Sequence, residues 1–357
     1  MTVALRLALP RPTLHAPFPV MKHRLLGRTG LLVSEICFGA MTFGGKGFWA
    51  VVGTHGETEA DHLVARAIDG GVNFFDTADV YSEGESERLL GKALAARRHD
   101  VVLATKVRGR VGPGPNEVGL SRGHILASIE GSLKRLGTDY VDLYQIHGFD
   151  PLTPFEETLR ALEDVVRSGK ARYLGCSNLA AWQLMKALGI SERQGWSRFD
   201  SLQAYYSIAG RDLEREVAPL LADQGVGLMV WSPLAGGLLS GKFSKDGAGP
   251  EGTRRATFDF PPVDKDRAFR VVDVMRAVAQ EKGTTVPRVA LAWVLRQKFV
   301  STVIIGAKDE AQLTDNLGAT ELTFTDEEAK RLDEVSALPK EYPGWMLERQ
   351  SAERVAR

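Results

Sequence analysis

Charged, polar and aromatic residues recur at one kind of place in this chain of 357 residues, the end of a short apolar run. Asp76, Lys106 and His147 each lie at the end of such a run, and Asn178 directly follows another. Carboxyl, ammonium and imidazole groups can hold or exchange protons, and an amide can orient a polar ligand. We therefore expect a chemical site if the fold brings these run ends together. The remaining run ends carry Gln203, Trp231 with Ser232, and Gly306.

Each of these residues, taken alone, also has a structural interpretation. Asp76 is compatible with a helix cap, Lys106 with a solvated charge at a rim, and His147 with a hydrogen-bonded core histidine. However, strand ends that serve structure alone more often carry turn residues such as Gly, Asn and Pro. The repetition of reactive side chains at the same edge therefore favours a functional site.

The apolar runs alternate with segments of helical period, which is typical of repeated β/α units. Eight such units predict a closed (β/α)8 TIM barrel with long loops at its carboxyl-terminal face, where the chemistry of barrel enzymes lies. We expect strands at 34–39, 72–76, 101–106, 141–147, 171–177, 201–205, 227–232 and 302–306. Expected helices include 59–69, 85–95, 122–136, 154–168, 213–222, 264–282, 286–297 and 310–317.

Composition excludes several functional classes. Lys and Arg together number 45 and so do Asp and Glu, so the net charge is zero and nucleic-acid binding by bulk charge is not expected. Two isolated cysteines offer neither a disulfide scaffold nor a cysteine zinc site, which favours the cytoplasm. No apolar stretch is long enough to cross a membrane. We expect a disordered amino-terminal appendage over residues 1–20, a barrel domain over 21–346 and a tail over 347–357.

Several common catalytic motifs are missing. The sequence has no Gly-x-Gly-x-x-Gly after a strand, no His-Glu-x-x-His, no Gly-x-Ser-x-Gly and no Tyr-x-x-x-Lys. Residues 236–243 resemble a P-loop, but Phe243 stands where a Ser or Thr must bind magnesium. We therefore expect no metal site, no Rossmann dinucleotide site and no NTPase.

Several strings, in order along residues 21 to about 346, resemble the aldo-keto reductase family. They include FFDTADVYSEGESERLLGKAL, LATKV, SLKRLGTDYVDLYQIHGFD, LGCSN, VWSPLAGGLLSGK and IIGAKDEAQLTDN. The resemblance implies a (β/α)8 barrel, in agreement with the eight units. It also implies reversible reduction of a small aldehyde or ketone with a nicotinamide cofactor, usually NADPH.

The resemblance implies four catalytic residues, Asp76, Tyr81, Lys106 and His147. Tyr81 would protonate the carbonyl oxygen as hydride reaches the carbon. Lys106 would stabilise the Tyr81 phenolate, Asp76 would pair with Lys106, and His147 would orient the carbonyl. Tyr81 could otherwise be a rim aromatic, but the positions of Lys106 and His147 at neighbouring strand ends favour the catalytic role.

The same resemblance implies a nicotinamide site around the barrel rim. Ser177, Asn178 and Gln203 would bind the carboxamide, and Trp231 would stack on the ring. Glycines near residue 236 would allow the backbone to approach the pyrophosphate. The expected cofactor-binding residues are Ala40, Met41, Asp76, Ser177, Asn178, Gln203, Trp231, Ser232, Pro233, Leu234, Gly236, Gly237, Lys242, Arg255, Gly306, Lys308, Gln312 and Asn316.

NADPH is favoured over NADH, although the chain departs from the family pattern. Many members carry Lys-Ser near Gly306 and an Arg near Gln312 to bind the 2′-phosphate; Lys308 with Arg255 are expected to replace them here. The chain also resembles potassium-channel β subunits in VWSPLAGG and SGK. An NADPH-binding regulatory or redox-sensing subunit with slow turnover is therefore the alternative, although those proteins have a different residue at the position of His147.

Substrate identity is left open by the sequence. Candidate pocket residues lie in segment 43–52, which contains Phe48 and Trp49, in the loop after Lys106, and in the tail at 342–346. An aromatic pocket would suit hydrophobic or aromatic carbonyls, but the same residues could pack on the barrel. Self-association of the chain is compatible with the sequence.

Overall fold

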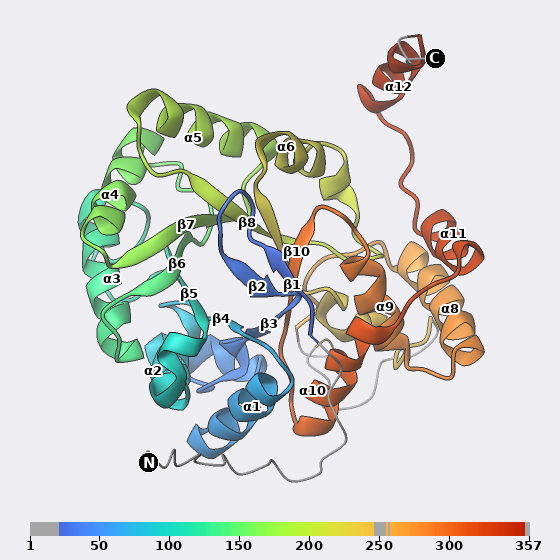
Figure 1. Ribbon diagram of the computed structural model, residues 1–357, viewed down its shortest axis with the longest axis horizontal. Helices are drawn as coiled ribbons and strands as arrows, with labels where there is room; N and C mark the ends of the chain where they lie inside the picture. The colour runs from blue at the N-terminus through green and yellow to red at the C-terminus, as the bar shows by residue number, and fades with distance from the viewer. Residues whose placement is uncertain (1–20, 246–254, 256–257, 354–357) are drawn as a thin grey trace, which may run out of the picture.

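Eight parallel strands close into a barrel in the order β10-β3-β4-β5-β6-β7-β8-β9 (Figure 1). The computed structural model describes residues 21–245, 255 and 258–353. An antiparallel hairpin precedes the barrel. The strands are β1 His23–Leu25, β2 Leu32–Ser34, β3 Ile36–Gly39, β4 Phe74–Asp76, β5 Val102–Val107, β6 Val141–Ile146, β7 Ala171–Ser177, β8 Phe199–Tyr205, β9 Gly227–Trp231 and β10 Val300–Ile305.

A ring of helices surrounds the strands (Figure 1). The α-helices are α1 Glu57–Asp69, α2 Glu85–Leu94, α3 Arg122–Leu136, α4 Phe155–Arg167, α5 Ala181–Gln194, α6 Val217–Gln224, α8 Lys265–Glu281, α9 Val286–Leu295, α10 Glu310–Leu317, α11 Asp326–Val335 and α12 Gly344–Ala352. Short 3-10 helices are η1 Ala40–Thr42, η2 Gly47–Val51, η3 Tyr81–Gly84, η4 Ala95–Asp100, η5 Asp212–Glu214, η6 Ala235–Ser240 and η7 Gly318–Glu321.

The expected TIM barrel is confirmed, and β7, α3 and α10 have the expected bounds. The expected strand 34–39 is instead divided, because Ser34 ends β2 and Ile36 begins β3. The expected domain limit at 346 falls inside α12, which stands apart from the barrel in Figure 1. The predicted appendage at 1–20 lies outside the described residues.

Period-two alternation along the strands builds a layered barrel interior. An inner apolar cluster contains Cys37, Phe74, Val102, Leu143 and Met229, whereas the neighbouring residues on the same strands pack outward against the helices. Toward the carboxyl ends of β4, β5, β6 and β8, the last inward positions are polar. Asp76, Lys106, Gln145 and Gln203 therefore form the top layer of the barrel interior, above an apolar floor.

The β1–β2 hairpin lies across the amino-terminal end of the barrel. Leu26 and Val33 of the hairpin join the inner cluster, and Gly27 adopts a φ of 61° where its backbone meets the start of β9. A side chain at Gly27 would come within 2.3 Å of the Asp200 carbonyl oxygen. The polar layer is therefore open only toward the carboxyl-terminal face.

In the part of the chain that the structure describes, no helix has the combination of length and apolarity needed to span a membrane. The same residues contain no group of three or more His, Cys, Asp or Glu side chains arranged to bind a metal ion. Cytoplasmic location and self-association stay predictions.

Candidate active site

Asp76 and Lys106 lie side by side at the carboxyl ends of β4 and β5, and they are 3% and 0% exposed. The Lys106 ammonium donates to Asp76 Oδ1 at 2.5 Å and to the Thr77 carbonyl oxygen at 2.8 Å. Burial alone would lower the pKa of Lys106, but the attraction of Asp76, followed by that of Tyr81, leaves the pKa raised. Lys106 is therefore a buried, charged ammonium held in one position.

Two glutamines complete the bonding of Asp76. Gln145 of β6 and Gln203 of β8 donate to Asp76 Oδ2 at 2.9 and 3.0 Å, and Gln203 also donates to Gln145 Oε1 at 3.2 Å. Sequence reasoning placed Gln203 at the cofactor and missed Gln145. The available signal was a polar residue at the inward phase of a strand, two positions after the inward Leu143.

Tyr81 stands over the Lys106 ammonium at the start of η3. Its hydroxyl lies 3.3 Å from Lys106 Nζ and 3.4 Å from His147 Nε2, and the side chain is only 7% exposed. Trp49 of η2 packs on the Tyr81 ring with centroids 4.7 Å apart. The structure thus brings Lys106 and His147 to the Tyr81 hydroxyl, and Asp76 joins the group through its pairing with Lys106.

The Tyr81 pKa reflects two opposing effects. Burial raises it above 10, and the Lys106 ammonium lowers it, so the net direction is upward. Asp76 and Asp79 add smaller upward effects. Tyr81 therefore holds its proton, while Lys106 is placed to stabilise a phenolate once the proton leaves.

His147 follows β6 directly and is neutral. Burial, and then the positive charges of Lys106 and Arg108, lower the pKa of His147 well below 6.5. A neutral imidazole carries one N–H and one acceptor nitrogen. His147 can therefore hydrogen-bond Tyr81 and an uncharged carbonyl oxygen without adding charge of its own.

The nicotinamide residues expected at the rim form a connected group. Asn178, with a φ of 55° just after β7, donates to Ser177 Oγ at 2.8 Å and accepts from Trp231 Nε1 at 3.0 Å. Ser177 in turn donates to the Gln203 carbonyl oxygen at 2.9 Å. Trp231 stacks on Phe260 with centroids 5.7 Å apart and planes 7° apart. These contacts link the rim to the Asp76 layer through Gln203.

The loop after β9 exposes backbone in left-handed conformations. Ser232, Ala235, Gly236 and Gly237 have φ values of 51°, 48°, 65° and 96°. The Gly236 N–H bonds Ser232 Oγ, and a side chain at Gly237 would meet open space. Non-glycine residues in this region are strained and concentrate at functional sites. Pro233 is buried and Leu234 half-buried in the same turn.

Arg255 is used to hold this loop. It is 7% exposed, and its guanidinium donates to the carbonyl oxygens of Ala235 and Pro261 at 2.5 and 3.0 Å and pairs with Asp259 at 2.8 Å. Lys242, by contrast, is exposed. Of the two cations expected along the phosphates, Lys242 is thus the more accessible.

The residues expected around adenosine gather at the start of α10. Asp309 caps this helix by accepting from the Gln312 N–H, and Gln312 Oε1 accepts from the Lys308 N–H, each at 2.7 Å. Asn316 donates to the Gly306 carbonyl oxygen at 3.4 Å. Lys308 itself is exposed. Ala40 is buried and Met41 half-buried in η1, above the end of β3.

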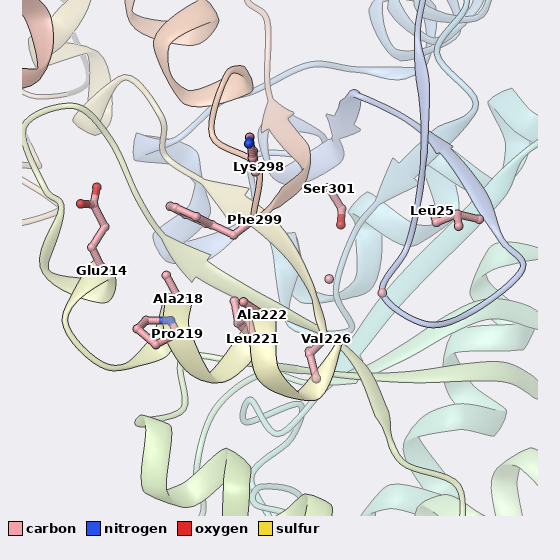
Figure 2. Close-up of a pocket in the computed structure, with 13 residues that line it drawn as sticks. Leu25, Glu214, Ala218, Pro219, Leu221, Ala222, Val226, Lys298, Phe299 and Ser301 are labelled. Carbon is pink, nitrogen blue, oxygen red and sulfur yellow. The ribbon is translucent and has the colours of Figure 1, made fainter. Parts of the chain in front are cut away.

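Two hollows lie at opposite ends of the barrel. One has a volume of about 630 Å³. It lies between the hairpin, α6 and the start of β10, and Figure 2 shows the residues that line it. Its lining includes Leu25, Leu221 and Phe299 but none of the four catalytic candidates. A second hollow of about 260 Å³ is lined in part by Tyr205, which lies 5.3 Å from Trp231 by ring centroids. The larger pocket is therefore not where the acid–base groups meet.

Comparisons with known proteins agree with this geometry. The model of the aldo/keto reductase family matches residues 35–337. The chain is 40% identical over 326 residues to the uncharacterized oxidoreductase YrpG of Bacillus subtilis, covering 88% of this chain and 96% of that protein. It is 39% identical to a probable voltage-gated potassium channel subunit beta of Arabidopsis thaliana, covering 85% and 92%. It is 35% identical to versiconal hemiacetal acetate reductase of Aspergillus parasiticus, covering 91% and 99%.

Proposed function

Because the chain belongs to the aldo/keto reductase family, we propose that it reduces an aldehyde or ketone to an alcohol with NADPH, using Tyr81 as proton donor. The observation that carries the proposal is the position of the Tyr81 hydroxyl, 3.3 Å from Lys106 Nζ and 3.4 Å from His147 Nε2. A proton donor, a cation to stabilise its conjugate base and a neutral hydrogen-bonding imidazole thus meet at one point.

Each residue has a distinct task in this proposal. Tyr81 releases its proton to the carbonyl oxygen, and the Lys106 ammonium stabilises the resulting phenolate. Asp76 keeps Lys106 charged and in place, with Gln145 and Gln203 orienting the carboxylate. His147 hydrogen-bonds the carbonyl oxygen. Because the side chains are already ordered by these bonds, little reorganisation is needed at the moment of reaction.

The residues at the rim fit a nicotinamide nucleotide. The accessible Asn178 amide can bond a carboxamide, and Trp231 offers an aromatic plane. The left-handed loop presents backbone with room for phosphate at Gly237, where a side chain would meet open space. When bound, the reduced nicotinamide supplies the hydride that this chemistry needs. Ser177, Asn178, Gln203 and Trp231 would hold its ring.

The preference for NADPH over NADH rests on Lys308. Its side chain is exposed at the start of α10, whereas Arg255 is committed to loop carbonyl oxygens and Asp259. We therefore assign the larger share of 2′-phosphate recognition to Lys308. Replacing Lys308 with Ala should weaken NADPH binding and leave NADH binding nearly unchanged.

An aromatic or hydrophobic carbonyl is the proposed substrate class. Trp49 lies against the Tyr81 ring, and Phe48 packs on Trp49 and on Phe258 with centroids 5.5 and 5.3 Å apart. Such surfaces favour planar apolar substrates. The tail residues expected to share this pocket are placed differently, since Tyr342 is 75% exposed and Trp345 43% exposed.

The test is loss of reduced-nicotinamide absorbance with a panel of aromatic and aliphatic aldehydes and ketones, using NADPH and NADH in parallel. The proposal expects turnover with aromatic carbonyls and a preference for NADPH that Lys308→Ala removes. Turnover restricted to aliphatic substrates would contradict the substrate class. Equal use of both cofactors by the wild type would contradict the NADPH assignment.

The second candidate is a regulatory subunit that binds NADPH and turns over slowly. It is favoured by the similarity to a probable voltage-gated potassium channel subunit beta. Tight NADPH binding without turnover of any carbonyl in the same panel would support this alternative over the reductase.

A further inference from the structure

Asp79 is a buried carboxyl group that the proposed reaction does not use. It lies in the turn between β4 and η3, after Asp76 and before Tyr81, and it is 2% exposed. Its backbone N–H donates to the Lys106 carbonyl oxygen at 3.2 Å, which ties the turn to β5. No side chain among the described residues donates to either carboxyl oxygen, and the hydrogen bond that lowers the pKa of Asp79 comes from the adjacent Val80 backbone.

Arg135, the cation nearest to offering Asp79 a counter-charge, is already paired with another acid. Glu87 of α2 is fully buried and accepts from Thr105 Oγ1 and Arg135 Nε, both at 2.6 Å. Burial, and then the charge of Glu87, raise the pKa of Asp79 to about 8. Asp79 is therefore mainly a neutral acid at neutral pH. The ionisable groups that face it are Tyr81, Glu87, Lys106, Arg135 and Tyr144.

A structural role would be expected to give this carboxyl group a side-chain donor. Asp76 and Glu87, its two nearest buried acids along the chain, are both bonded to side-chain donors. A buried polar group without a partner costs stability, and ionisable groups in such settings concentrate at functional sites. The backbone bond to Lys106, the place of Asp79 two residues before Tyr81 and the upward effect of its charge on the Tyr81 pKa point to the Tyr81 hydroxyl as the group it serves.

We propose that Asp79 is a positioning residue that controls, through its charge, how readily Tyr81 releases its proton, a role that rests on the carbonyl reduction proposed above. As a neutral acid, Asp79 leaves the Lys106 ammonium unopposed beside the Tyr81 hydroxyl. Once ionised, it adds a negative charge to the same side of the site and opposes Lys106. Tyr81 then holds its proton more tightly and becomes a poorer donor, so reduction slows on the alkaline side.

The test compares the pH dependence of kcat/KM in the wild type and in Asp79→Asn, since an amide has the shape and neutral charge of the protonated acid. The wild type should lose activity as pH rises through about 8, and Asp79→Asn should keep it through the same range. At alkaline pH the variant should then exceed the wild type several-fold, with similar activity at neutral pH. If kcat/KM of the two proteins changes in the same way at alkaline pH, the proposal is overturned. If Asp79→Asn does not fold, Asp79→Ser can be tested in the same way.

Asp200 provides a matched control. Burial raises its pKa to about 6, but it lies near the start of β8, at the opposite end of the barrel. Asp200→Asn should leave the alkaline limb unchanged. If Asp200→Asn changes kcat/KM at alkaline pH as much as Asp79→Asn does, the effect is not specific to Asp79 and the proposed role is overturned.

Infrared spectroscopy of the cofactor-free protein gives a readout that needs no activity. The wild type should show the C=O band of a neutral carboxylic acid that disappears as pH rises through about 8, and Asp79→Asn should lack it. Absence of the band in the wild type would overturn the inference even in an active reductase. A band that titrates in a protein without carbonyl turnover would instead overturn the proposed function.

Discussion

Asp76 ends β4 and Asp79 lies in the turn that follows it, and both are almost completely buried. Asp76 accepts from Lys106, Gln145 and Gln203, whereas no side chain in the described part of the chain donates to either oxygen of Asp79. An ammonium and two amides thus bond one carboxyl group, whereas burial raises the pKa of the other to about 8. The difference shows that hydrogen-bond donors and a dedicated counter-charge, rather than burial alone, decide the state of an acid in this site.

The largest expected effect comes from removing the charge of the bonded acid. Asp76→Asn leaves the Lys106 ammonium buried without its partner, which should cost about 3–5 kcal/mol of folding stability. Turnover should fall by roughly 10² or more because Lys106 no longer supports Tyr81. Chemical denaturation and steady-state rates measure the two losses.

An exposed acid provides the control for this change. Asp61→Asn on α1 should alter stability by less than about 0.5 kcal/mol. A stability loss this small in Asp76→Asn would contradict the difference between Asp76 and Asp79 described above.

Replacing Lys106 together with Asp76 should restore stability without restoring activity. Adding Lys106→Met to Asp76→Asn eliminates the unpaired buried charge, so about 1–4 kcal/mol of stability should return. Turnover should stay low because Tyr81 still lacks its cation. Denaturation of the single and double variants measures this recovery, and recovery of activity in the double variant would contradict the role of Lys106.

Removing the charge of Asp79 should stabilise the protein at alkaline pH, whereas removing that of Asp76 destabilises it. The pKa of Asp79 is raised from 3.8 to about 8 in the folded protein, so the wild type loses stability relative to Asp79→Asn as pH rises from about 4 to 8. Above pH 8 the variant should be more stable, by an amount on the order of a few kcal/mol. The two proteins should converge near pH 4. Denaturation across this range tests the sign, and a variant less stable at alkaline pH would contradict it.

The smallest effect concerns His147, which, like Asp79, is neutral because it is buried. Its pKa lies well below 6.5, so kcat/KM should show no break near pH 6.5 that belongs to this residue. The pH profiles of the wild type and His147→Gln should differ in height but have the same shape between about pH 6 and 7.5. A break in the wild type that vanishes in the variant would show that His147 is charged.

The sequence predicted the barrel, and the position of several candidate site residues at its strand ends, because both depend on local pattern. Period-two alternation places Lys106 inward on β5, and the strand order places it beside Asp76. The β1–β2 hairpin was not predicted, since its two strands have three residues each and expose Leu25 and Leu32. Such short strands carry too few residues for a clear period.

The sequence predicts where a side chain lies in the fold better than it predicts which groups that side chain bonds. Arg255 was expected at phosphate, but its guanidinium binds loop carbonyl oxygens and Asp259, contacts that depend on the folded loop. The lack of a partner for Asp79 is likewise a property of the packed structure, because Arg135 and Thr105 reach Glu87 from distant positions. Neither result has a signature in residue spacing.

The most direct test of the account is a single turnover of wild type and Tyr81→Phe loaded with reduced nicotinamide cofactor and mixed with an aromatic aldehyde. Tyr140→Phe, which changes a tyrosine beside Arg98 and Arg172 away from the site, is the control. The account predicts rapid loss of cofactor absorbance in the wild type and the control. In Tyr81→Phe it predicts almost none, with cofactor affinity unchanged. Loss of absorbance at the wild-type rate in Tyr81→Phe would contradict the assignment of Tyr81 as proton donor.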